Sequence, residues 1–247
     1  MAPNLYNPAK MRKHIPNAIT LLNLFFGCCA ILMLARQEYN WVYILFAASL
    51  VADFLDGMLA RLLQAYSELG KQLDSLADMI SFGALPGMIL YHLLSSSNSL
   101  INMADPWWSY GAFLFTMMAA YRLGKFNLDE RQSQDFLGIP TPAASLLTIG
   151  LLMIHQYNPM GLARLVDNEL FLGIYILGIS ALMISELPML GLKFKEWKWA
   201  GNEIRIIFVV LAVVCLPVFQ WAAPAVIISI YILLSLGRWI ITRNQAA

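Results

Sequence analysis

Charged residues are scarce in this sequence, and their scarcity narrows the class of protein. Only 13% of the 247 residues are Asp, Glu, Lys or Arg, whereas 60% are hydrophobic. A soluble domain carries about 25% charged residues, so the composition excludes an ordinary soluble globular protein. It indicates instead a protein that crosses a membrane several times.

Cysteines are few, and we expect neither a cleavable leader nor a soluble domain. Cys28, Cys29 and Cys215 lie in apolar segments without metal-ligand spacing, so we expect them to act as small apolar residues. The first apolar run is long enough to span a membrane and lacks the small-residue end of a cleavable signal. Because no polar stretch is large enough for a soluble domain, we expect any chemistry to take place in the membrane or just beneath it.

Long apolar runs are what the sequence has in abundance. A membrane-spanning helix needs about 20 predominantly apolar residues, and eight segments are expected to span. They are approximately residues 17–35, 41–63, 71–94, 107–124, 141–156, 168–185, 204–220 and 223–241. The fifth segment is short, and only a few residues ending in Pro224 separate the last two.

The distribution of basic residues predicts the orientation in the membrane. An even number of spans puts both termini on one side, together with the loops after the second, fourth and sixth spans. Every Lys and Arg except Arg36 and Arg164 falls on that side. Since basic residues are enriched in cytoplasmic loops, we expect both termini to be cytoplasmic.

Four aspartates interrupt the apolar pattern at the second and third segments. Each would cost about 2.5–3.5 kcal/mol near the bilayer centre, so such residues are functional candidates. Two share a face of the second segment and two share a face of the third, and an antiparallel hairpin would bring both pairs to a similar depth. The four are Asp53, Asp56, Asp74 and Asp78.

Clustered carboxylates suit a hard divalent cation. Oxygen ligands at this density favour Mg²⁺, Mn²⁺ or Ca²⁺ over zinc, and two such ions can clamp the attacking and leaving oxygens of a phosphoryl transfer. Gly57 and Ala60 continue the face of the first aspartate pair with little bulk, so a phosphate could approach the helix backbone. Arg61 follows and could pair with that phosphate.

Structural ion pairs and an ion pathway are the less favoured roles for the four aspartates. Ion pairs with Arg61 and Lys71 would leave carboxylates unneutralised, because two cations cannot balance four acids. An ion or proton pathway through a transporter also uses intramembrane acids. However, the four aspartates lie at one depth, and only His92 or His155 could continue such a path.

The aspartates belong to a longer pattern of fixed spacing. It reads D-x-x-D-G-x-x-A-R-x8-G-x-x-x-D-x-x-x-D and runs from Asp53 to Asp78. In this pattern the chain resembles the CDP-alcohol phosphotransferase family. The resemblance implies an all-α, polytopic membrane helix bundle with a six-helix core, here with about eight transmembrane helices in a single domain over residues 1–247. It also implies a homodimer with its active site on the cytoplasmic side.

The resemblance also implies roles for individual residues. The ligands of two divalent cations (Mg²⁺ or Mn²⁺, with Ca²⁺ also compatible) would be Asp53, Asp56, Asp74 and Asp78. Asp78 would in addition be the general base that takes the proton from the acceptor hydroxyl. The residues lining the CDP and diphosphate site would be Gly57, Ala60, Arg61 and Gly70.

Four further segments are similar to the phosphatidylserine synthase branch of that family. They are residues 16–24, 122–127, 136–144 and 183–188. This similarity implies transfer of the phosphatidyl group of CDP-diacylglycerol to L-serine, giving phosphatidylserine and CMP, in a bacterial cytoplasmic membrane. Two departures from the branch are Lys125, where arginine is usual, and Glu186-Leu187, which replaces a more usual apolar residue before the proline.

Serine recognition requires partners for both of its charges. Arg122 and Lys125 are the candidates for the carboxylate, and Asn127 and Ser81 could add hydrogen bonds. The two cations are equally explained as ordinary flanking charge of a cytoplasmic loop. Glycerol-3-phosphate or inositol phosphate are the alternative acceptors, although an anionic phosphate should need a denser basic pocket. A non-catalytic lipid-binding or ion-transport protein remains the alternative of another class, and no nucleic-acid partner is expected.

Three polar residues on one face of the first segment have two interpretations. Asn17, Thr20 and Asn23 recur at helical spacing. They could hydrogen-bond to the donor's head group or to neighbouring helices. Polar and small residues commonly mediate helix packing in membranes, so helix packing is the favoured interpretation.

Overall fold

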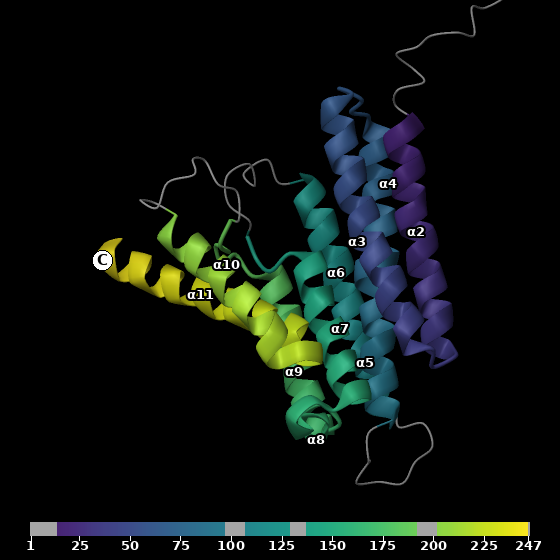
Figure 1. Cartoon of the computed structure of the whole chain (residues 1–247). Coiled ribbons are helices and arrows are strands. Elements are labelled where there is room, and N and C mark those ends of the chain that lie inside the picture. The colour runs from purple at the N-terminus through teal and green to yellow at the C-terminus, as the bar shows by residue number, and fades with distance from the viewer. Residues whose placement is uncertain (1–13, 97–106, 129–136, 192–201, 247) are drawn as a thin grey trace, which may run out of the picture. The chain divides into compact units, whose positions relative to one another are not determined.

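The structure is a computed structural model that describes residues 14–96, 107–128, 137–191 and 202–246 (Figure 1). The described residues are almost entirely helical, with one isolated bridge between Leu137 and Pro188. The chain divides into two compact units, Met1–Leu85 and Pro86–Ala247. The expected all-α class is therefore confirmed.

The first unit contains three helices that lie side by side in Figure 1 and a short π-helical turn. They are α2 (His14–Ala35), α3 (Tyr39–Leu62), α4 (Glu68–Asp78) and the turn η1 (Met79–Ala84). The chain reverses between α3 and α4, where Gln64 adopts a positive φ of 49°. Ser67 then caps α4, because its side chain accepts a hydrogen bond from the Gly70 N–H at 3.0 Å.

Small and polar residues on one face of α2 allow close packing in this unit. The buried residues of α2 alternate at spacings of three and four: Pro16, Thr20, Asn23, Gly27, Ala30 and Leu34. A Cβ on Gly27 would lie 3.0 Å from the Cα of Ser81, so only glycine permits α2 to approach η1 this closely. Phe46 and Phe82 pack edge to face beside this crossing, with ring centroids 5.8 Å apart.

The second unit is built mainly from longer helices joined by short helical turns. The first helix after the unit boundary is α5 (Leu85–Ser96). It is followed by η2 (Trp107–Ala112), α6 (Phe113–Leu128), α7 (Thr141–Tyr157), η4 (Pro159–Gly161), α8 (Ala163–Val166), α9 (Glu169–Ile184), α10 (Glu203–Phe219), η5 (Gln220–Ala222) and α11 (Ala223–Ala246). Buried α7 packs against α11, where a Cβ on Gly150 would lie 2.5 Å from the Ala225 nitrogen.

All eight segments expected to cross the membrane are helical, with ends close to those predicted. Four helical stretches of the described chain are long and apolar enough to cross: His14–Ala35, Tyr39–Leu62, Glu68–Ser96 and Glu203–Ile241. Glu169–Ile184 is a shorter apolar helix. The last long stretch joins the seventh and eighth predicted segments, so the count of eight spans stays a prediction, as does a single domain over the whole chain.

Candidate active site

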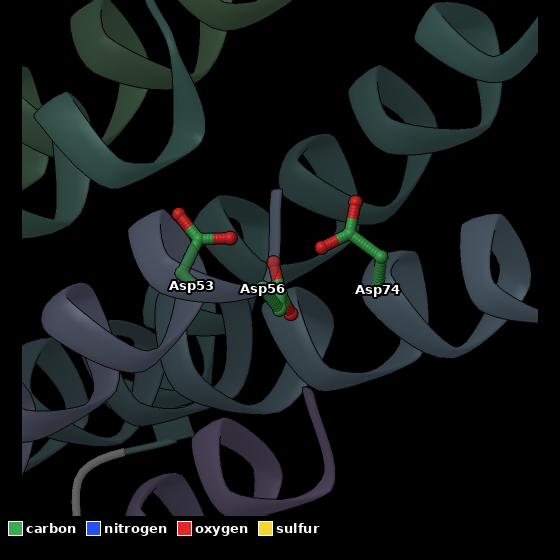
Figure 2. Close-up of side chains that lie close together, drawn as sticks. All are labelled: Asp53, Asp56 and Asp74. Atoms are coloured by element: carbon green, nitrogen blue, oxygen red, sulfur yellow. The ribbon is translucent and has the colours of Figure 1, made fainter. Parts of the chain in front are cut away.

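The facing sides of α3 and α4 bring three of the four aspartates together. Carboxylate oxygens of Asp53, Asp56 and Asp74 lie within 4.8 Å of one another. Figure 2 shows the side chains of Asp53 and Asp74 turned toward each other, with Asp56 between them. Positions three apart on α3 share a face. The chain reverses at Gln64, and α3 and α4 both pack on α2, so the aspartates of the two helices converge.

Asp78 lies next to this group, at the end of α4. Its carboxyl group lies close to that of Asp53. On its other side, Nδ2 of Asn23 donates a hydrogen bond to Oδ1 of Asp78 at 3.2 Å. All four predicted aspartates thus meet within the first unit, with Asp78 between α2 and α3.

The chemistry of this donor set fits a divalent cation. Asp56 is only 5% exposed, and Asp53, Asp74 and Asp78 are half-buried. Gathering carboxylates away from water is costly unless a positive charge compensates them. Every donor is a hard oxygen atom, which suits Mg²⁺, Mn²⁺ or Ca²⁺ and not a thiolate-seeking metal.

A cavity of about 1060 Å³ opens beside the aspartates. Its lining includes Asp53, Asp56 and Asp74 and all four residues predicted for the CDP site: Gly57, Ala60, Arg61 and Gly70. A Cβ added to Gly57 would meet nothing within 4 Å, so this glycine borders open space. Pro16, Asn17 and Thr20 bring α2 to the same cavity. The cavity is large enough for a nucleotide-sized group.

The residues predicted to bind serine fall in both units. Ser81 belongs to the first unit, where it is fully buried and its hydroxyl donates to the backbone carbonyl of Asn23 at 3.0 Å. Arg122, on α6, is 8% exposed, and its Nη1 donates to Oγ1 of Thr141 at 3.0 Å. Lys125 forms an ion pair with Glu186 at 3.2 Å, and Asn127 is half-buried near the end of α6. Their role in binding serine stays a prediction.

The structure adds contacts that the sequence did not assign. Thr20 and Asn23 contact the aspartates, and the signal in the sequence was their shared helix face, for which helix packing was the favoured interpretation. Glu186 contacts Lys125, and the signal was that both residues depart from the family pattern. Thr141 contacts Arg122; both residues fall in segments similar to the phosphatidylserine synthase branch, but the sequence did not pair them.

Comparison with known proteins identifies the family. The profile of the CDP-alcohol phosphatidyltransferase family matches residues 13–185, which include all four aspartates. The chain belongs to this family. The predicted family is thereby confirmed, and this CDP-alcohol phosphatidyltransferase is an integral membrane enzyme of phospholipid biosynthesis.

Three curated relatives of this family member share the name CDP-diacylglycerol–serine O-phosphatidyltransferase. The protein of Helicobacter pylori (strain J99) is 30% identical over 227 residues, covering 91% of this chain and 90% of the relative. The Bacillus subtilis (strain 168) protein is 30% identical and covers 77% and 94%. The Methanocaldococcus jannaschii protein is 30% identical and covers 83% and 86%.

Proposed function

We propose that the protein transfers the phosphatidyl group of CDP-diacylglycerol to L-serine, giving phosphatidylserine and CMP. One observation carries the proposal: the aspartates of α3 and α4 converge at a cavity lined by Gly57, Ala60, Arg61 and Gly70. The choice of serine is supported by the names of relatives that match most of the chain. We further propose a homodimer in a bacterial inner membrane, with the active site on the cytoplasmic side.

Different residues of the first unit bind different parts of CDP-diacylglycerol. When bound at the aspartates, two divalent cations would neutralise the diphosphate and the departing CMP. Asp53, Asp56, Asp74 and Asp78 are the ligands that would hold them. Gly57 and Ala60 leave room for the phosphates against α3, and the Arg61 guanidinium pairs with phosphate oxygens.

Asp78 is proposed as the general base. Its carboxylate takes the proton of the serine hydroxyl, and the serine oxygen attacks the phosphorus that bears the diacylglycerol. The bond from that phosphorus to the CMP oxygen breaks, and CMP leaves. Because these groups are held in place before the reaction, positioning and electrostatic stabilisation supply most of the rate.

The second part of the proposal is that the acceptor is serine. Arg122 and Lys125 are proposed to receive the serine carboxylate, with Asn127 and Ser81 as further hydrogen-bonding groups. A zwitterion needs fewer cations than glycerol-3-phosphate or inositol phosphate would. The ion pair of Lys125 with Glu186 supports this view, because it lowers the local positive charge available to a phosphate.

The experiment compares acceptors on the purified full-length protein. CMP release is measured with CDP-diacylglycerol and Mn²⁺ or Mg²⁺, adding serine, glycerol-3-phosphate or inositol phosphate in turn. We expect release to depend on serine and on the divalent cation. Release that depends on glycerol-3-phosphate or inositol phosphate instead would keep the family and overturn serine.

Two variants separate catalysis from folding. Asp78→Asn should lose CMP release while the protein still elutes as a folded species in detergent. Asp167→Asn is the matched control, since Asp167 pairs with His155 in the second unit and has no proposed role in catalysis. Full activity of Asp78→Asn would contradict the proposed base.

A further inference from the structure

Two side chains of α2 reach the aspartates of α3 and α4. Oγ1 of Thr20 donates a hydrogen bond to Oδ2 of Asp56 at 2.5 Å. Nδ2 of Asn23 donates to Oδ1 of Asp78 at 3.2 Å. Thr20 is 3% exposed and Asn23 is 0% exposed, so both donor side chains are buried. Each aspartate pair therefore has one member held by α2.

These hydrogen bonds have a defined direction. A carboxylate that binds a cation only accepts hydrogen bonds, so the amide nitrogen of Asn23 must face Asp78. The Thr20 hydroxyl also lies 3.1 Å from the Pro16 carbonyl, but its single proton goes to the shorter contact with the charged carboxylate. In each case the α2 side chain donates to one oxygen of the carboxylate.

The backbone of α2 is itself anchored at this point. The carbonyl oxygen of Asn23 accepts hydrogen bonds from Oγ of Ser49 on α3, at 3.3 Å, and from Oγ of Ser81 in η1, at 3.0 Å. All three residues are fully buried. The Asn23 side chain is thus presented to Asp78 from a backbone that α3 and η1 hold in place.

A packing role alone does not account for the amide of Asn23. Its Oδ1 is buried and makes no hydrogen bond to any part of the chain that the structure describes. A buried acceptor without a partner costs about 1–3 kcal/mol. Beside a cation site, an amide oxygen of this kind could accept from a metal-bound water or contact the ion.

We propose that Thr20 and Asn23 are positioning residues of the metal site, which orient Asp56 and Asp78 toward the divalent cations. The inference rests on the proposed metal-dependent function and extends it to α2. Hydrogen bonds of this kind fix the ligand carboxylates before the ion arrives, and their loss typically weakens metal binding 10–100-fold. α2 therefore contributes residues to the metal site in addition to packing against α3 and α4.

The test measures Mn²⁺ affinity of the full-length protein in detergent by electron paramagnetic resonance of free Mn²⁺. Thr20→Val and Asn23→Leu remove the donors at nearly constant volume, and each should weaken Mn²⁺ binding about 10–100-fold. Thr20→Ser keeps the hydroxyl and should bind close to wild type. Thr148→Val is the matched control: it makes the same change as Thr20→Val at a buried threonine of the second unit, whose hydroxyl hydrogen-bonds to the Ala144 carbonyl and the Tyr175 hydroxyl and has no proposed role in the metal site.

The outcomes separate this inference from the proposed function. If the wild type does not bind Mn²⁺, or if Asp53→Asn binds as well as the wild type, the metal site itself is wrong. If Asp53→Asn loses binding while Thr20→Val and Asn23→Leu bind like the wild type, only the role of α2 is overturned. Folding is checked by the unfolding temperature in EDTA. Should Thr20→Val or Asn23→Leu fail to fold, Thr20→Ala and Asn23→Ala remove the same donors with smaller side chains. The same 10–100-fold loss of Mn²⁺ affinity is then expected of them.

Discussion

Lys125 and Glu186 are 61 positions apart in the chain, yet they form an ion pair in the second unit, with 3.2 Å between Nζ and Oε1. Both residues depart from the pattern of the phosphatidylserine synthase branch. The Lys125 side chain is 32% exposed and that of Glu186 is 64% exposed, so water screens the pair. Such pairs contribute about 0–1 kcal/mol to stability. We therefore expect the pair to matter more for serine binding, through the positive charge of Lys125, than for folding.

Neutralising Lys125 and Glu186 separately would test whether Lys125 binds the serine carboxylate. Lys125→Gln should raise the KM for serine about tenfold or more, because a charge-assisted hydrogen bond to the carboxylate contributes about 1.5–3 kcal/mol. Its KM for CDP-diacylglycerol should stay unchanged. Glu186→Gln leaves the cation in place, so its KM for serine should stay the same or fall. Equal increases in both variants would show that the pair is structural and that Lys125 does not bind serine.

At the scale of elements, the end of α9 is joined to the segment before α7. The Gly138 N–H donates to the Leu187 carbonyl at 2.9 Å, and the Ile139 N–H donates to the Leu182 carbonyl at 3.1 Å. Gly138 has a φ of +69°, and a Cβ there would lie 2.7–2.9 Å from the carbonyl oxygens of Leu182, Met183 and Ser185. Two sequence segments that resemble the same branch are therefore in contact, and glycine is required at the crossing.

Gly138→Ala should destabilise the second unit. The positive φ alone costs a side chain about 1–3 kcal/mol, and the three carbonyl oxygens add steric conflict. Thermal unfolding in detergent should show a clear fall in the midpoint. Gly178→Ala is the control, because a Cβ on Gly178 in α9 meets nothing within 4 Å and alanine favours a helix by about 1 kcal/mol. Similar midpoints for the two variants would mean that the crossing at Gly138 does not require glycine.

At the scale of the whole molecule, the orientation in the membrane decides which compartment supplies serine. The turns at the two ends of α3 offer a direct test, because α3 is long enough to span and both turns carry an exposed glutamine. Gln37 lies between α2 and α3, and Gln64 lies between α3 and α4. The positive-inside rule puts Gln64, which is near the acidic site, on the cytoplasmic side.

Cysteine labelling in intact bacteria checks this orientation. In a background with Cys28, Cys29 and Cys215 replaced by alanine, Gln37→Cys should react with a membrane-impermeant maleimide added outside. Gln64→Cys should react only after the cells are permeabilised. The two positions are well matched, since both have a positive φ and an exposed side chain. The reverse labelling pattern would place the acidic site on the outer face.

The sequence by itself determined what depends on local physics. The bilayer requires about 20 apolar residues for each spanning helix, and the predicted segments correspond closely to α2, α3, α6, α7, α9, α10 and α11. Helical periodicity alone put Asp53 beside Asp56 and Asp74 beside Asp78. The fixed spacing through Arg61 and Gly70 identified the family, and these residues line one cavity with three of the aspartates.

Only the tertiary structure decided which residues meet across helices. Thr20 with Asp56, Asn23 with Asp78 and Lys125 with Glu186 come from different elements. Periodicity gives the face on which a residue lies, but the partner opposite that face depends on how closely the helices pack. In the first unit, Gly27 allows that close approach, and the same crossing buries Ser81 against the backbone of Asn23. The polar face of α2 was therefore visible in the sequence, whereas its contact with the aspartates required the packed structure.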